Sequence, residues 1–335
     1  MLHKVGGYID MSLLSQFFSS GVSKQTIPIE IFAVGGGGGG GGGSAPGQYG
    51  AGGGAGQVLY QQLRVNVGVA YTITIGSGGA GGVNGPAPAR TGNAGSNTTF
   101  GSIICYGGGG GGGAVQGPTT AFGSTGGVGE GYLGGYPTSN DYYISSKFPN
   151  TPNMSVGVSG FRLQAEGTPG YSGSLLPTAS RGASGGGGAQ YYPKSLQDQA
   201  PVNFDYRVLA AGQDGIPAEY IGISTFIVGG GGAGGCPSPG PLFSIPYYKA
   251  GFGGGGGVNA VGAGPQNGDA STGGGGAGAG NRDPLAGSGG SGGLVIRYPT
   301  GYAAATAIGN TTSVPSQPGF YVYRWTSGPG SITFN

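Results

Sequence analysis

The side chains in this sequence that could do acid–base chemistry are its few carboxylates. Cleavage of a glycosidic bond needs two carboxyl groups that flank the bond. The candidates lie in the middle and late parts of the chain: Glu130, Asp141, Glu166, Asp198, Asp205, Asp214, Glu219, Asp269 and Asp283. They stand alone in stretches rich in Pro, Gly and Tyr, and no spacing pairs two of them. We therefore expect no carbohydrate-cleaving activity.

Nucleophilic and metal chemistry lack the residues that they need. His3 is the only histidine, so neither a Ser-His-Asp nor a Cys-His arrangement can form inside the domain. Two cysteines and one remote histidine fall short of the usual zinc ligand sets. Glycine patterns that resemble phosphate loops lack the Lys-Ser/Thr ending. We expect a protein that is not an enzyme and has no cofactor and no metal.

The two cysteines, Cys105 and Cys236, flank glycine tracts. A bridge between them is possible, but a chain this long does not need one. We expect two free, buried thiols at the ends of the tracts.

Tyrosine is the residue type best suited to binding in this chain. Tyr combined with Ser, Gly and Asn is the composition of binding loops, because it gives a large contact area at low entropic cost. Eleven of the 20 tyrosines lie between residues 130 and 252: Tyr132, Tyr136, Tyr142, Tyr143, Tyr171, Tyr191, Tyr192, Tyr206, Tyr220, Tyr247 and Tyr248. These residues either bind a receptor, such as a host surface saccharide or an outer-membrane protein, or pack over the glycine tracts and shield their backbone.

The composition favours an ordered chain in spite of its 88 glycines and 7% charged residues. Disordered chains are poor in aromatic residues, whereas this one has 20 Tyr and 13 Phe in short apolar runs. A net charge of +2 without any Lys/Arg cluster argues against nucleic acid as a partner. No stretch reaches the ~20 apolar residues of a membrane span, and Met1–Ser20 does not resemble a signal peptide. We expect a soluble protein made in a cytoplasm.

Short apolar runs predict β-strands. Ile27, Ile29 and Ile31 alternate with Pro28, Glu30 and Phe32, which is the period of a half-buried strand. The other predicted strands are Val58–Val67, Tyr71–Ile75, Ser102–Tyr106, Ile221–Val228, Leu294–Tyr298, Phe320–Trp325 and Ser331–Phe334, with a turn at Asn66–Ala70.

Most of these runs adjoin a glycine tract, the longest of which is the nine-residue tract Gly35–Gly43. Ordering nine glycines costs on the order of 10–18 kcal/mol, while a net hydrogen bond returns only ~1 kcal/mol. A single glycine tract therefore cannot stay ordered on its own, whereas in a bundle the hydrogen bonds between tracts can offset the entropic cost of ordering. We predict an all-β and irregular fold in which short strands cap a stack of polyglycine helices of three residues per turn, with long exposed loops at about 130–222 and 236–252.

The first segment, residues 1–26, has a different composition. Leu13, Leu14, Phe17 and Phe18 have helix-like spacing, so this segment is either an attachment element that docks on a particle protein or a disordered terminus. The glycine-rich domain then spans residues 27–299, and residues 300–335 form a linker and a β-hairpin.

Several motifs resemble the glycine-rich domain of bacteriophage tail and virion structural proteins. They are VGGGGGGGGG, YTITIGSGGAGG, the TFGSI step and GGLVIRYP, within residues 27–299. The architecture is also similar to that of tail-fibre adhesins that stack polyglycine rods. The resemblance implies a structural protein located in the virion and assembled in the host cytoplasm, with other virion proteins of the tail fibre, tail or capsid as partners.

One departure from the family pattern concerns the hairpin that precedes the first strand in the family. The similar segment in this sequence, Tyr323–Phe334, lies instead near residue 335. We expect it to dock beside Ile27–Val34, either in its own chain or on a neighbouring copy in a homo-oligomer.

Three hypotheses for function remain. The first is a surface-exposed phage protein, either a tail-fibre or tail-tip adhesin that contacts the host or a capsid decoration protein without a receptor role. The second is a passive glycine-rich scaffold. The third is a carbohydrate-cleaving tailspike.

Overall fold

The structure, a computed structural model, is all-β in the part of the chain that it describes. It describes residues 25–43, 50–83, 89–113, 160–163, 186, 216–217, 227–232, 254–256, 264–279, 285–309, 311–312 and 317–335. In these ranges the regular elements are strands, and no helix is present. The predicted all-β fold class is confirmed.

The larger sheet has six antiparallel strands around the first predicted strand. Its order is β11 (Thr311–Thr312), β12 (Phe320–Trp325), β9 (Gly293–Pro299), β1 (Thr26–Val34), β2 (Val58–Asn66) and β6 (Gly160–Leu163). Ile27, Ile29 and Ile31 are buried to 2% exposure or less, as their period-two spacing predicts. The central strand thus has one face in the core.

The second sheet has five antiparallel strands. Its order is β10 (Thr306–Ile308), β13 (Pro329–Thr333), β3 (Ala70–Thr74), β4 (Thr98–Phe100) and β5 (Ile103–Cys105), and a separate pair is formed by β7 (Ile216–Pro217) and β8 (Ile227–Val228). The turn between β2 and β3 contains Gly68, whose φ of 74° suits glycine best. The predicted turn at Asn66–Ala70 is therefore present.

Aromatic side chains fill one core to which both sheets contribute. Trp325 of β12 and Ile332 of β13 have no exposed surface, and neither has Phe334 directly after β13. Tyr298 packs edge-on against Phe334, with ring centroids 5.4 Å apart. The Trp325 indole N–H donates to the carbonyl of Ile308 at 3.2 Å, so its polar atom is satisfied inside the core.

The C-terminal strands differ from the predicted hairpin. β12 pairs with β9 in the first sheet, and β13 pairs with β3 and β10 in the second, so the two strands do not pair with each other. The reason is that Trp325 and Ile332 both point into the core from strands that belong to different sheets. Docking within the same chain is what the structure shows, because Ile332 and Phe334 share one buried cluster with Ile29 and Ile31.

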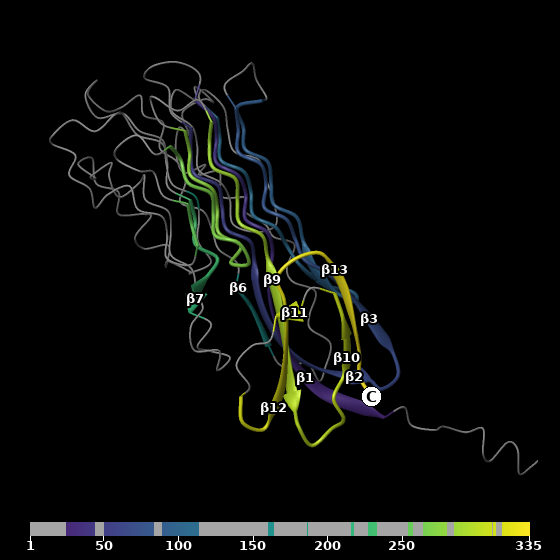
Figure 1. Ribbon diagram of the computed structural model, residues 1–335. Coiled ribbons are helices and arrows are strands. Elements are labelled where there is room, and N and C mark those ends of the chain that lie inside the picture. Colours follow the sequence, from purple (N-terminus) through teal and green to yellow (C-terminus); the bar gives the residue numbers. More distant parts are fainter. Residues whose placement is uncertain are drawn as a thin grey trace, which may run out of the picture.

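Glycine tracts continue directly from the strands and run side by side away from the sheets (Figure 1). We call them rods and name them by their residues: 35–43, 50–57, 75–83, 89–97, 106–113, 273–279 and 285–292. The rod 35–43 is fully buried and lies at the centre.

Hydrogen bonds from the central rod repeat every three residues. Its N–H groups donate to three neighbours: Gly35, Gly38 and Gly41 to residues 57, 54 and 51; Gly36, Gly39 and Gly42 to residues 96, 93 and 90; Gly37 and Gly40 to residues 290 and 287. The falling partner numbers show that these three rods are antiparallel to it. A period of three is the period of a helix with three residues per turn.

The carbonyl groups of the central rod bond three other neighbours. They accept from Gly79 and Gly82, from Gly108 and Gly111, and from Gly276 and Ala279, at 2.8–2.9 Å. The residue numbers of these donors rise along with those of the central-rod acceptors, so the three rods run parallel to the central rod. The central rod thus has hydrogen bonds to six rods, which is the convergence of tracts into one lattice that the sequence predicts. The polyglycine helix type of each rod stays a prediction.

Steric crowding explains why residues 35–41 of the central rod are all glycine. A Cβ placed on any residue from Gly35 to Gly41 would meet a neighbouring backbone carbonyl well inside 3.0 Å. The rod 75–83 has fewer neighbours and needs fewer glycines. After the buried Ile75, its buried positions are Gly76, Gly79 and Gly82, and a Cβ at Gly78 or Gly81 would also meet a neighbouring backbone carbonyl, whereas Ser77, Ala80 and Val83 are exposed.

Candidate functional site

A groove opens on the outer face of the larger sheet where β1 and β9 separate. The β1–β9 ladder ends at the pair Glu30–Arg297, and the next residues on that face are Pro28 and Pro299. Proline has no N–H to extend a ladder. β1 nevertheless continues to pair with β2 as far as Thr26. The two strands thus part, and a groove of about 340 Å³ lies there.

Residues from four neighbouring strands line this groove: Pro28, Ile29, Glu30, Gln62, Leu63, Arg64, Arg297, Tyr298, Pro299 and Phe320. Strand register places the outward-facing ones in two rows. One row runs Gln62, Glu30, Arg297 and the other runs Arg64, Pro28, Pro299, Phe320. The groove therefore has a polar wall beside an apolar strip of two prolines and one aromatic ring.

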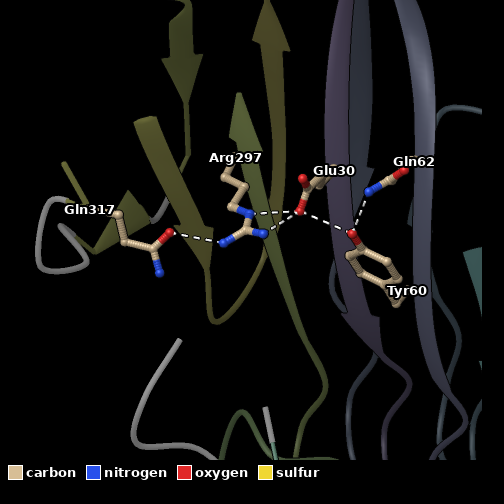
Figure 2. A network of polar contacts seen from close by, with 5 residues as sticks. All are labelled: Glu30, Tyr60, Gln62, Arg297 and Gln317. Atoms are coloured by element: carbon tan, nitrogen blue, oxygen red, sulfur yellow. Dashed lines mark hydrogen bonds and ion pairs between the residues drawn. The ribbon is translucent and has the colours of Figure 1, made fainter. Parts of the chain in front are cut away.

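An ion pair fixes the polar wall (Figure 2). Arg297 donates from Nε at 2.7 Å and from Nη2 at 2.6 Å to the same carboxylate oxygen, Oε2 of Glu30. The Tyr60 hydroxyl donates to that oxygen at 3.1 Å and accepts from the Gln62 amide at 2.8 Å. The other end of the guanidinium donates from Nη1 to the Gln317 side chain at 3.0 Å. The wall is thus cross-linked over the strands β2, β1 and β9 and is preorganised.

Aromatic and apolar contacts hold the rest of the groove. The Arg297 guanidinium carbon lies 5.1 Å from the centre of the Phe320 ring, which is cation–π range. Arg64 is exposed and donates from Nε to the Thr26 hydroxyl at 2.8 Å. Arg297 is balanced by Glu30, whereas the partner of Arg64 in that bond is an uncharged hydroxyl.

Burial raises the pKa of Tyr60, and the nearby carboxylate of Glu30 adds to this effect. The phenol therefore stays protonated at neutral pH, which keeps it a hydrogen-bond donor to Glu30. The groove thus offers one carboxylate held by an arginine, with a phenol and an amide in fixed positions beside it.

The sequence-predicted binding residues cannot be compared with this groove. The eleven tyrosines from Tyr132 to Tyr248 and the attachment residues Leu13, Leu14, Phe17 and Phe18 lie outside the described residues. Of the predicted carboxylates only Asp269 is described, on an exposed segment.

Cys105 is where the sequence places it, at the junction of β5 and the rod 106–113. Its side chain is 1% exposed, and the thiol donates to the Gln57 carbonyl at 2.9 Å. It is a free cysteine. The prediction of a buried free thiol is confirmed for Cys105, while Cys236 lies outside the described residues.

The groove itself was not predicted from the sequence. Glu30 and Arg297 are 267 residues apart, so only the β1–β9 register brings them together. A signal was present in the two prolines, because Pro28 interrupts a predicted strand and Pro299 ends one.

Among the described residues, no group of three or more His, Cys, Asp or Glu side chains gathers in a way that could hold a metal ion. In the same part of the chain, no helix has the length and apolar character that crossing a membrane requires.

Residues 15–299 match the sequence model of a family described as a glycine-rich domain. No curated protein matches the chain.

Proposed function

Because this chain belongs to the glycine-rich domain family, we propose that it is a structural protein without enzymatic activity, exposed on the surface of a bacteriophage particle. In this proposal a β-sandwich carries a stiff lattice of glycine rods, and the lattice presents loops away from the sheets. The motif resemblance to phage tail and virion proteins supports a location on a phage particle. The hydrogen-bonded rods support the structural role.

The single observation that carries the proposal is the bonding of the central rod. Its N–H and C=O groups bond six neighbouring rods. A tether that only joins domains needs no such partners, because flexible Gly-rich linkers behave as random coils. A lattice with this many mutual bonds resists bending, and a spacer that must hold a binding surface at a fixed distance requires that property.

Within this role we favour a tail-fibre or tail-tip adhesin over a capsid decoration. The chain leaves the described lattice after Gly113, at the end far from the sheets. The sequence that follows contains Tyr132, Tyr136, Tyr142 and Tyr143, in the composition typical of binding loops. A host surface saccharide or an outer-membrane protein is the proposed target.

Electron microscopy of intact particles tests the proposed location. Antibodies against the chain should label the tip of the tail or of its fibres. Label on the capsid would favour the decoration role, and absence of the chain from purified particles would overturn the proposal.

Adsorption measurements test the proposed loops. The double variant Tyr142→Ala with Tyr143→Ala should slow adsorption of particles to host cells. The matched control is Thr72→Ala with Thr74→Ala on the exposed side of β3, which should leave adsorption unchanged. Unchanged adsorption of the tyrosine variant, with intact particles, would argue that these tyrosines only cover the rods.

A further inference from the structure

We propose that the groove between β1 and β9 is a binding site for a short acidic saccharide. This site goes beyond the proposed function, which depends on the rods and on the sequence that follows Gly113, where the described chain ends far from the sheets. The groove lies at the opposite end, since its residues are in the halves of β1 and β9 that point away from the rods.

The volume of the groove limits the size of the ligand. Ligand pockets generally span ~300–1,000 Å³, so a groove of about 340 Å³ is at the small end of that range. One or two pyranose rings fit this space, whereas a folded partner domain does not enter it.

The apolar strip suits the flat C–H face of a sugar ring. Pro28 and Pro299 both line the groove, each two residues beyond the last β1–β9 pair, and Phe320 pairs with Pro299 on the next strand. Sugars pack this face on rings and expose their hydroxyls at the edge. A ligand that lies on the strip therefore turns its hydroxyls toward Glu30 and Gln62 in the adjacent row.

The polar wall suits hydroxyl groups because it is held in place before a ligand arrives. The Glu30 carboxylate binds Arg297 and Tyr60 through Oε2, and Oε1 takes part in neither contact. That second oxygen is an acceptor for a ligand hydroxyl. The side chain needs little further ordering on binding, which lowers the entropic cost.

Charge then selects an acidic sugar over a neutral one. Glu30 balances Arg297 within the wall, and Arg64 at the rim adds one positive charge. Arg64 is exposed and can form a charge-assisted hydrogen bond with a carboxylate. One sugar carboxylate at Arg64 would make the occupied groove neutral.

The same geometry argues against a bound peptide strand. Strand addition depends on main-chain hydrogen bonds from a sheet edge. Here Pro28 and Pro299 occupy the two rims and offer no N–H. A nucleic-acid strand is disfavoured as well, because the described lining of the groove has two arginines, one of them paired with Glu30, and these cannot follow a row of phosphates.

Calorimetric titration of the full chain tests the site. The probe is a disaccharide of one galacturonic acid residue and one neutral galactose residue, with its methyl ester as the uncharged counterpart. We expect saturable binding of the acid and binding about tenfold weaker for the ester, the loss of one charge-assisted hydrogen bond.

Variants then locate the binding. Arg64→Gln should weaken binding of the acid about tenfold and leave binding of the ester unchanged, which removes the preference. Gln62→Ala should weaken both ligands equally. Arg90→Gln is the matched control, because it removes the same charge from the rod 89–97, far from the groove. Wild-type binding should persist in it.

Three outcomes would overturn the site. They are the absence of saturable binding to the folded chain, equal binding of acid and ester, and binding that Arg64→Gln and Gln62→Ala leave unchanged. Acetate competing as well as the disaccharide would show simple anion pairing and would also refute it. None of these outcomes touches the proposed virion role, which particle labelling tests separately.

Discussion

A single methyl group in the central rod should destabilise the whole lattice. Gly38 donates to the Gly54 carbonyl at 2.8 Å and accepts from Gly276 at 2.9 Å. A Cβ at this position would meet the carbonyl of Gly109 well inside 3.0 Å. Gly38→Ala therefore forces the rods 35–43 and 106–113 apart.

The cost follows from the bonds that a displacement of Gly38 would break. Besides its own two bonds, Gly38 lies between the bonds Gly108 to Gly36 and Gly111 to Gly39. Four bonds at ~1 kcal/mol each amount to about 4 kcal/mol. The smaller entropy of alanine in the unfolded chain offsets about 0.4–1 kcal/mol. We expect the free energy of unfolding to fall by about 3 kcal/mol, a large part of the stability of a typical domain.

Urea unfolding measures this change, with two readouts. Trp325 is the only tryptophan and is fully buried, so its fluorescence reports on the sandwich. Amide exchange reports on the rods. The matched control is Gly301→Ala, where a Cβ would have no heavy atom within 4 Å, and we expect a change of less than about 1 kcal/mol. If Gly38→Ala unfolds within about 1 kcal/mol of the wild type by both readouts, the close packing of the rods is refuted.

Four further predictions concern the sandwich. Burial raises the pKa of Tyr298, so the stability that its neutral phenol provides is complete below the unfolded pKa of about 10 and is lost as the pH rises above it. Tyr298→Phe should therefore reduce the loss of unfolding free energy at alkaline pH. An unchanged slope of that free energy against pH would contradict the assignment. Trp325→Ala should lower the free energy of unfolding by about 3–5 kcal/mol in urea titrations followed by circular dichroism, because the side chain is fully buried. In a chain whose other cysteine is replaced by alanine, Cys105 should react with a thiol reagent only after unfolding, and fast labelling of the native chain would be inconsistent with its burial. Glu30→Gln should cost about 1–3 kcal/mol in thermal or urea unfolding, since it leaves the Arg297 guanidinium without its anion; no loss would show that the ion pair contributes nothing.

Local patterns were enough to predict the strands that adjoin glycine tracts. Ile27, Ile29 and Ile31 alternate with outward residues, and β1 has the burial that this period requires. The lattice could be predicted as well, because isolated glycine tracts cannot offset the entropy of ordering.

Long-range pairing could not be predicted. The turn residues of the C-terminal segment indicate a hairpin, but nothing local shows that β12 and β13 face each other across a core from different sheets. The groove has the same origin, since the pair Glu30–Arg297 exists only through the register of β1 and β9.

The spacing of glycines within a tract is related to the number of rods that surround it. In the rod 75–83 every third residue, at Gly76, Gly79 and Gly82, is a buried glycine. In the central rod every residue is glycine, because it has neighbours on all sides. Glycine spacing in the sequence thus reflects how many neighbours a rod has.

Hydrogen exchange across residues 35–43 and 107–113 is the most direct test of the hydrogen-bonded lattice. The account predicts that the amides of Gly35 to Gly42, Gly108 and Gly111 exchange far more slowly than those of a glycine peptide of the same length, because their N–H groups donate to neighbouring rods. Exchange at the rate of the free peptide in the native protein would contradict the lattice, and with it the role proposed for this chain.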